Sequence, residues 1–255
     1  MQLATWNVNS LNVRLPQVLA WLATNPVDVL ALQELKLTDD KFPAQAFADA
    51  GYQAQWFGQK TYNGVALLSR SPAVEVIKNI PGFEDEQSRV LCATIDGVRV
   101  IGAYFPNGQE PGSDKFAYKM RWLDALREWV RTEMAQHPQL MLMGDYNITF
   151  DDLDVWDPEG LRETIHCTTE ERTQLQGLIG LGLHDAHRLF EQPPKSFSWW
   201  DYRQLGFQKN RGLRIDHILI TDALKARAKA CTIDRAPRKN PQPSDHAPVV
   251  LTLAD

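Results

Sequence analysis

Polar side chains that can bind a metal ion or transfer a proton follow, interrupt or directly precede several apolar segments of this sequence. Amides, carboxylates and one imidazole occupy these positions: Asn7, Glu34, Asp145, Asn147, Asp216, Asp245 and His246. A charged group beside an apolar core is costly unless it is paired or bound to a metal ion. If the segments converge, these side chains therefore form one anionic pocket that is rich in oxygen ligands.

The types of these side chains indicate which metal and which reaction such a pocket would serve. Carboxylate and amide oxygens without a thiolate suit Mg²⁺ or Mn²⁺ rather than zinc. His246, which directly follows Asp245, can hydrogen-bond a phosphate oxygen or transfer a proton near neutral pH. The combination is typical of metal-assisted hydrolysis of a phosphoester.

Each of these residues, taken alone, also has an ordinary structural explanation. An Asn or Asp at the end of a strand more often caps a turn than binds a ligand. Asp245–His246 could lie in a surface loop, and Asp216 could pair with Arg214 or Arg211. The recurrence of the pattern favours a common site, although the spacing leaves convergence open.

The apolar patterns predict many strands and fewer helices. Strands are expected near residues 3–6, 28–32, 64–69, 98–104, 140–143 and 215–220. Helices are expected over 115–136, from Thr168 or Thr169 through Leu178, and over 16–23. No linker or low-complexity segment divides the chain, so residues 1–255 are expected to form one domain, a layered α/β or α+β sandwich.

The composition provides material for a large core and shows no sign of a membrane segment. The chain has 255 residues, of which 44% are hydrophobic, and no stretch approaches the roughly 18 apolar residues of a membrane helix. Its first residues lack the pattern of a signal peptide. The three cysteines (Cys92, Cys167 and Cys231) are widely spaced and odd in number, which argues against a disulfide framework. These features predict a cytoplasmic protein with no membrane partner.

The charge of the chain gives a mixed indication about a nucleic-acid partner. The net charge of −5 argues against binding a polyanion, but one positive face is enough for such binding. Basic residues gather in two late segments, 209–214 and 235–239. Taken alone, these segments are more typical of solvated loops.

Eight motifs together resemble the exonuclease III and apurinic/apyrimidinic (AP) endonuclease family, the DNA-repair branch of the endonuclease/exonuclease/phosphatase superfamily. They are Trp6–Ser10, Leu32–Lys36, Tyr62–Ala66, Tyr104–Gly108, Gly144–Ile148, Phe197–Arg203, Arg211–His217 and Ser244–Pro248. The resemblance implies a four-layer α/β sandwich of two face-to-face mixed sheets flanked by helices. It also implies a Mg²⁺-dependent nuclease, with Mn²⁺ as a substitute, that acts on double-stranded DNA with 3′ ends, nicks or abasic sites. The segment Phe197–Arg203 distinguishes the DNA-repair branch from related phosphatases and phospholipases.

The resemblance assigns roles to the polar residues at the strand ends. Glu34 would be the principal Mg²⁺ ligand, helped by Asn7 and Asp245, with Asp145, Asn147 and His246 also at the metal site. Asp145 would position or deprotonate the attacking water or protonate the leaving group, and Asn147 would orient it. His246, held by Asp216, would bind a phosphate oxygen, and Tyr104 would lie against the scissile phosphate. The choice of general base among Asp145, Tyr104 and the Asp216–His246 pair stays open.

The resemblance also predicts a pocket for an extruded sugar, formed by five residues: Tyr62, His166, Cys167, Arg172 and Trp200. Trp199 is expected in the core instead. At His166–Cys167 the chain departs from relatives, which commonly carry a small residue followed by an aromatic one. An imidazole there would fill the space of a baseless sugar and bias the enzyme towards 3′ ends. The alternative is that residues 165–168 form a variable loop facing solvent.

Two other functions remain as alternatives at this stage. The chain could be an inactive family member that binds nucleic acid as a regulator, or a phosphomonoesterase or phospholipase of the same superfamily. Family resemblance further implies a monomer that is associated with the nucleoid when it acts.

Overall fold

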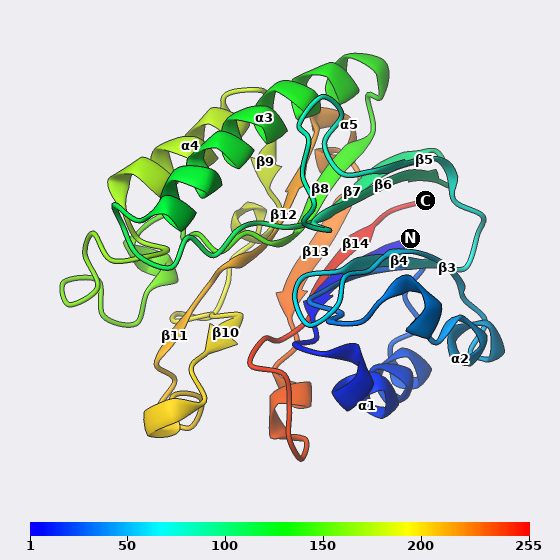
Figure 1. Cartoon of the computed structure of the whole chain (residues 1–255), viewed down its shortest axis with the longest axis horizontal. Helices are drawn as coiled ribbons and strands as arrows, with labels where there is room; N and C mark the ends of the chain where they lie inside the picture. Colours follow the sequence, from blue (N-terminus) through cyan, green and yellow to red (C-terminus); the bar gives the residue numbers. More distant parts are fainter.

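Two six-stranded β-sheets lie face to face in the computed structural model, which describes residues 1–255 (Figure 1). The spatial order of the first sheet is β13 (Ala228–Ile233), β14 (Val249–Leu253), β1 (Gln2–Asn7), β2 (Val29–Gln33), β4 (Val65–Ser69) and β3 (Gln53–Phe57). The order of the second is β5 (Val74–Lys78), β6 (Val90–Ile95), β7 (Val98–Tyr104), β8 (Leu140–Asp145), β12 (Asp216–Ile220) and β9 (His184–Asp185). Both sheets are mixed, because β1 is parallel to β2 and β7 to β8 while the other neighbours are antiparallel. A separate antiparallel pair consists of β10 (Trp199–Trp200) and β11 (Gly212–Leu213).

Helices cover the outer faces of the two sheets (Figure 1). The first sheet carries α1 (Leu11–Thr24) and α2 (Ala44–Asp49), and the second carries α3 (Asp114–Gln136) and α4 (Thr169–Ile179). The remaining helices are short: α5 (Asp222–Lys225) and the 3₁₀ turns η1 (Asp39–Lys41), η2 (Asp152–Asp154), η3 (His187–Leu189), η4 (Arg203–Leu205) and η5 (Ala236–Lys239). No helix of the chain has both the length and the apolar character needed to cross a membrane.

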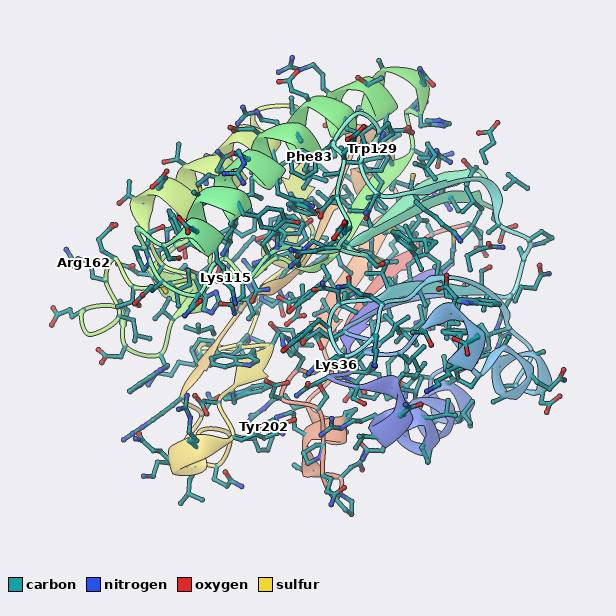
Figure 2. The ribbon with its side chains drawn as sticks, in the orientation of Figure 1. Lys36, Phe83, Lys115, Trp129, Arg162 and Tyr202 are labelled. Atoms are coloured by element: carbon teal, nitrogen blue, oxygen red, sulfur yellow. The ribbon has the colours of Figure 1, made fainter.

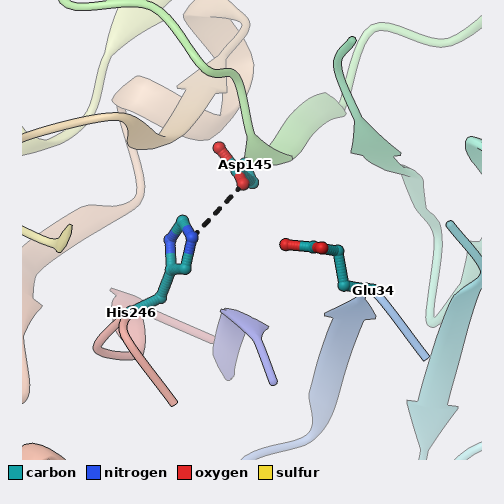
Figure 3. Close-up of side chains that lie close together, drawn as sticks. All are labelled: Glu34, Asp145 and His246. Carbon is teal, nitrogen blue, oxygen red and sulfur yellow. Dashed lines mark ion pairs between the residues drawn. The ribbon is translucent and has the colours of Figure 1, made fainter. Parts of the chain in front are cut away.

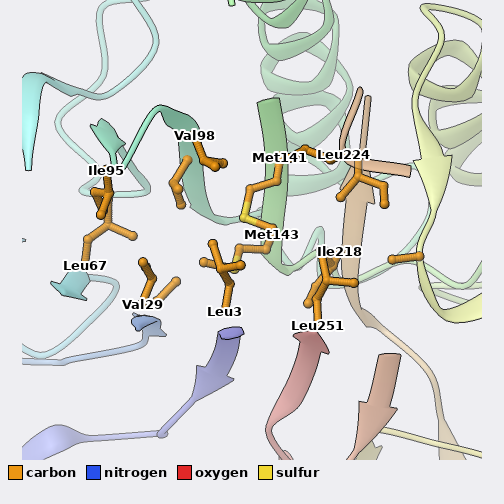
Figure 4. Close-up of a cluster of buried hydrophobic side chains, with 14 of the residues drawn as sticks. Leu3, Val29, Leu67, Ile95, Val98, Met141, Met143, Ile218, Leu224 and Leu251 are labelled. Carbon is orange, nitrogen blue, oxygen red and sulfur yellow. The ribbon is translucent and has the colours of Figure 1, made fainter. Parts of the chain in front are cut away.

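Three apolar layers separate the helices and sheets. Leu3, Met141 and Ile218 lie in the layer between the two sheets (Figure 4). The next residues along two of these strands, Ala4 and Leu142, face the helices on the outer sides. Strand side chains alternate between faces, and both faces of the central strands are covered, so β2 and β8 are largely apolar. The edge strand β5 is mostly exposed and alternates with charged residues. The result is the four-layer α/β sandwich that the sequence predicts.

One edge of the sandwich collects the carboxyl ends of several strands. On the parallel pair β1 and β2, Asn7 lies opposite Gln33, so Glu34 emerges beside the end of β1. On the second sheet, Asp145 lies opposite Tyr104 of β7 and opposite Asp216 of β12. The strand registers therefore bring together side chains that are far apart in the sequence.

Two helix starts show how far the local pattern predicts an element. Thr168 caps α4 and forms a reciprocal capping box with Glu171, as predicted. The helix expected over 16–23 instead begins at Leu11, although Pro16 removes one hydrogen-bond donor inside it. The amide of Leu11 donates to the carbonyl of Leu35 at 3.0 Å, and the Leu11 side chain is buried. This tertiary contact starts the helix ahead of the proline, and local sequence does not reveal it.

Candidate active site

Glu34, Asp145 and His246 turn towards one another at the strand-end edge (Figure 3). One potential ligand atom of each lies within 4.8 Å of those of the other two. The three residues come from the end of β2, the end of β8 and the segment before β14. They line a cavity of about 230 Å³, which we call the catalytic cavity, together with Asn9, Tyr104, Asn107, Asn147, His166, Trp199, Ile215 and Asp245.

Asn7 connects the carboxylates of the two sheets. Its Nδ2 donates to Glu34 Oε2 at 2.6 Å and to Asp145 Oδ2 at 2.9 Å. Its Oδ1 accepts the backbone N–H of Asn9 at 2.9 Å, and this donor fixes the orientation of the amide. Asn7 therefore presents its NH₂ group, not its oxygen, to the carboxylates. In this orientation the amide of Asn7 positions the two carboxylates. Its role as a metal ligand stays a prediction.

His246 is held between two buried carboxylates. Its Nδ1 lies 2.8 Å from Asp216 Oδ2, and its Nε2 lies 3.5 Å from Asp145 Oδ2. The alternative pairing of Asp216 with Arg214 or Arg211 is wrong, because Arg214 binds Asp154 and Asp185. The ring is oriented from one side by Asp216 and faces the catalytic cavity with Nε2.

Two of the cavity residues adopt the left-handed backbone conformation. Glu34 has φ of 53° and Asn147 has φ of 52°, values that non-glycine residues adopt at some energetic cost. Asn147 is fixed there by its backbone N–H, which donates to Asp145 Oδ1 at 2.9 Å, and by Nδ2, which donates to the carbonyl of Phe105 at 2.9 Å. Such strain at several site residues is a common property of functional sites.

The cluster contains more negative than positive groups, and the pKa values reflect this. Burial, together with Asp216 and Glu34, raises the pKa of Asp145 to about 8, while His246 acts in the opposite direction. Burial opposes the charged form of His246, but Asp216 and Asp145 outweigh it and raise its pKa well above the usual range. Burial and the nearby carboxylates also raise the pKa of the Tyr104 phenol. We therefore expect a protonated imidazole and a protonated phenol in the cavity near neutral pH.

The donor set fits a hard divalent cation. Glu34, Asp145 and Asp245 supply carboxylate oxygens to one cavity, and no cysteine lines it. Asp216 Oδ1 is buried and has no hydrogen-bond partner, so this acceptor is unsatisfied within the chain. Asp245 is oriented by Trp199 Nε1 at 3.0 Å and by Asn9 Nδ2 at 3.3 Å. A cation would balance the charge that His246 alone does not.

His166 separates the catalytic cavity from a larger one. Together with Trp199 and Asn107 it lines both the catalytic cavity and a neighbouring cavity of about 650 Å³. Its side chain is only 8% exposed, and its Nδ1 lies 2.6 Å from the carbonyl of Asn147. The alternative of a solvent-facing loop at 165–168 is wrong, because Cys167 and Thr168 are buried as well.

Trp200 was predicted to line the sugar pocket and Trp199 to lie in the core, and the structure shows the reverse. Trp200 is fully buried, packs with Phe197 and Ala247, and does not line the catalytic cavity. Trp199 lines it and donates to Asp245. Successive residues of a strand point to opposite faces, so only one of the pair can face the cavity. The long-range bridge between Trp199 and His246 decides which one does.

The other predicted pocket residues lie outside the catalytic cavity. Cys167, the residue after His166, is buried in a hydrophobic cluster with Val155 and Leu213. Arg172 donates to Thr149 and Asp152. Tyr62 is 67% exposed and lines a separate depression of about 340 Å³ that shares Tyr104 and Asn107 with the catalytic cavity. None of the three reaches the space beside the carboxylates.

Several residues that contact the candidate site were not predicted from the sequence. Asn9 and Trp199 orient Asp245, and Lys36 Nζ lies 3.6 Å from Glu34 Oε1. Lys119 is fully buried and donates to the carbonyls of Asn107 and Asn147, at 3.1 Å and 2.8 Å. Asn9 and Lys36 lie inside motifs that carry the family resemblance, so a signal existed for them. Lys119 lies on α3 among ordinary helix charges and carried no such signal.

The comparison with known proteins identifies the family of the chain. Residues 4–246 match the Endonuclease/Exonuclease/phosphatase family. The chain is 35% identical to exodeoxyribonuclease III of Haemophilus influenzae, over 98% of each chain. The chain belongs to the exonuclease III and AP endonuclease family. This confirms the family and the four-layer fold predicted from the motifs.

Solved structures of family members superpose closely on this one. The protein NExo from Neisseria, described as a 3′ phosphatase in a structure bound to a product DNA hairpin, is 49% identical with a TM-score of 0.98 and full coverage of both chains. A second structure, described as the 3′-5′ exonuclease NExo from Neisseria meningitidis, is 50% identical with the same TM-score and full coverage of both chains. An AP endonuclease from Archaeoglobus fulgidus is 31% identical with a TM-score of 0.95, over 99% of each chain.

Proposed function

We propose that the chain is a metal-dependent DNA-repair nuclease specialised for 3′ ends, with 3′-phosphatase and 3′–5′ exonuclease activity and weak activity at internal abasic sites. The observation that carries this proposal is the buried His166 in the wall of the catalytic cavity. The description of the similar protein NExo as a 3′ phosphatase and 3′-5′ exonuclease supports it.

The reaction that these residues can perform is hydrolysis of the P–O3′ bond. A water oxygen bonds to phosphorus, the P–O3′ bond breaks, and one proton of the water ends on O3′, so the DNA strand keeps a 3′-hydroxyl. Glu34 and Asp245 would hold Mg²⁺, or Mn²⁺ in its place, which supplies positive charge against the phosphate and makes a bound water more acidic. Asn7 and Lys36 fix the position of Glu34, and Asn9 and Trp199 fix Asp245.

His246 and Tyr104 act on the phosphate. The imidazolium of His246, held by Asp216, donates from Nε2 to a non-bridging oxygen and stabilises charge that grows in the transition state. The protonated phenol of Tyr104, at the end of β7, donates to the same phosphate group. Since both groups carry their protons near neutral pH, neither serves as the base.

Asp145 is the group that remains to move the proton of the attacking water. It is almost fully buried, and Asn7 and Asn147 hold its two oxygens. Its raised pKa makes Asp145 a stronger base than a free carboxylate. The charge of a divalent cation beside it would lower that pKa again, so that the carboxylate is ionised at neutral pH. Asn147, which donates to Asp145 through its backbone, keeps this carboxylate pointed into the cavity.

His166 restricts what can lie on the far side of the phosphate. Burial, followed by Lys119, lowers the pKa of His166 to about 3, so the ring is neutral, and its Nδ1–H donates to Asn147. A ring fixed in this way occupies space that a baseless sugar within a duplex would need. A 3′-phosphate carries no such sugar, and a terminal nucleotide is free to turn away because no strand continues beyond it. We therefore expect 3′-phosphate to be removed fastest and internal abasic sites to be cut slowest.

A substrate panel tests this function. The wild-type protein is given a nicked duplex with a 3′-phosphate, a duplex with a recessed 3′-hydroxyl end, a duplex with an internal abasic site, and an inositol phosphate. We expect kcat/KM to fall in the order of the three DNA substrates and no hydrolysis of the inositol phosphate. Incision of the abasic duplex as fast as removal of the 3′-phosphate would contradict the specialisation. Hydrolysis of the inositol phosphate alone would contradict the assignment to DNA.

A further inference from the structure

A second depression, of about 720 Å³, lies beside the catalytic cavity between the loop after β10 and the turn η5. Its lining includes Tyr202, Phe207, Arg235, Arg238 and Lys239, and we call it the arginine groove. The two segments that form it project together from the lower end of the molecule in Figure 1, and Figure 2 places Tyr202 there. The residues assigned to catalysis do not line this groove.

Arg238 is a buried cation without a counter-ion in the chain. Its side chain is 7% exposed, and Nη1 donates to the carbonyl of Ser244 at 3.0 Å. Its Nε is buried and has no hydrogen-bond partner. The guanidinium carbon lies 4.9 Å from the ring centroid of Phe207 and 5.6 Å from that of Tyr202, within the range of cation–π contacts. Burying a charge in this way is costly unless an anion compensates it.

Two further cations add to the charge of the groove. Arg235 stacks on Phe207 with 4.8 Å between guanidinium and ring centroid, and Arg235 and Lys239 are exposed and form no ion pair. The acid that lines the groove, Asp201, is already bound by Arg203 at 2.7 Å. The net charge of the whole chain is −5, so this local excess of positive charge is not a general property of the surface.

The groove is joined to the catalytic cavity by short contacts. Tyr202 OH donates to the carbonyl of Pro243 at 2.6 Å and accepts from Asn9 Nδ2 at 3.4 Å. Asn9 also contacts Asp245, and Arg238 holds the carbonyl of Ser244, the residue before Asp245. A DNA backbone with one phosphate in the catalytic cavity therefore has further phosphates within reach of this surface.

We propose that the arginine groove binds a second phosphate group of the DNA, away from the scissile one, through Arg238, Arg235 and Lys239. This inference rests on the proposed function, since it takes DNA as the substrate. The phosphate anchors the duplex while the catalytic cavity acts on the 3′ end. Both an internal phosphodiester and the 5′-phosphate at a nick have the chemistry that the groove recognises.

The test uses the double variant Arg235→Gln/Lys239→Gln, because both side chains are exposed and their loss should not unfold the protein. The matched control is Lys225→Gln/Lys229→Gln, which removes two exposed cations outside the groove. Binding of a long duplex is measured against salt concentration without a divalent cation, so that no turnover is needed. For the groove variant we expect the negative slope of log affinity against log salt concentration to become shallower by about 1 for each lost phosphate contact. The slope of the control variant should not change. An equal slope in both variants would overturn the proposal.

Kinetics give the second readout. For the groove variant, the ratio of kcat/KM on a 3′-phosphorylated duplex to kcat/KM on thymidine 3′-phosphate should fall at least several-fold, through KM. A loss confined to nicked duplexes with a downstream 5′-phosphate identifies a terminal phosphate, and an equal loss without it identifies an internal one. Equal losses on duplex and mononucleotide would overturn the proposal. A wild type that binds DNA but cleaves none would contradict the proposed function and leave the binding test valid.

Discussion

Two buried charge clusters include residues near the start of β12, Arg214 in one and Asp216 in the other, and they are built in opposite ways. In the first, Arg214 lies between Asp154 and Asp185, and Arg188 contacts Asp154 as well, so two cations face two carboxylates. Burial opposes the charged form of Asp154, but these pairs outweigh it and lower its pKa to about 2. In the second, the catalytic cluster, burial and neighbouring carboxylates raise the pKa of Asp145 to about 8. We expect the balanced cluster to stabilise the fold, and in the proposed function the unbalanced one binds a cation and a phosphate. Burial alone does not tell the two apart, whereas the balance of charge does.

Substitutions in the balanced cluster should lower the stability of the fold. Arg214→Met removes the cation that neutralises two buried carboxylates, so we expect a loss of about 3–5 kcal/mol in the free energy of unfolding. Urea denaturation measures it. Arg188→Met is the matched control, since Arg188 contacts the same Asp154 from a more exposed position and should cost less than about 1 kcal/mol. If both variants lost the same small amount of unfolding free energy, the cluster would not stabilise the fold through its ion pairs.

Substitutions in the catalytic cluster should lower the reaction rate and leave the stability of the fold nearly unchanged. His246→Asn and Asp216→Asn each remove transition-state stabilisation, so we expect kcat to fall roughly 10²-fold or more while the melting temperature changes little. The double variant should be scarcely slower than the worse single one, because Asp216 acts by holding His246. Single-turnover rates test this, and losses that multiply would show that the two residues act independently.

Glu34→Gln should weaken cation binding in the catalytic cluster and leave the fold intact. It removes one ligand charge and no core volume, so we expect the divalent-ion affinity to fall about 10- to 100-fold, with partial recovery of the rate in Mn²⁺. Activity titrated with Mg²⁺ and Mn²⁺ measures both effects. A variant that cleaves normally at limiting Mg²⁺ would remove Glu34 from the metal site.

Acid should weaken the balanced cluster. The folded-state pKa of Asp154 is about 2, below its usual value of 3.8, so its contribution is complete above pH 4 and is lost as the pH falls towards 2. The shift corresponds to roughly 2 kcal/mol. Denaturation of wild type and Asp154→Asn across this pH range gives the contribution as the difference between the two curves. If the unfolding free energies of the two proteins changed in parallel with pH, the lowered pKa of Asp154 would be contradicted.

The comparison also shows what the sequence could and could not predict. Glu34, Asp145 and His246 follow or precede apolar strands within family motifs, so their convergence could be predicted. Arg214 and Asp216 are two residues apart, and the sequence placed Arg214 in a basic segment with no hint of its partners. Only the fold brings Asp154 and Asp185 to it. Local patterns predict which residues lie at a strand end, but the partner of a charge depends on contacts across the sheets.

The wall of the catalytic cavity provides the most direct test of the proposed specialisation. His166 has φ of 73°, a conformation that glycine adopts freely, so His166→Gly should remove the imidazole without unfolding the loop. Glu163→Gly is the matched control, because Glu163 has φ of 58° in the same loop but does not line the catalytic cavity. The quantity to measure is the ratio of abasic-site incision to 3′-phosphate removal, each as kcat/KM. We predict that His166→Gly raises this ratio at least several-fold through faster incision, and that Glu163→Gly leaves it unchanged. A ratio unchanged in His166→Gly, with a wild type already equally active on both substrates, would contradict the account.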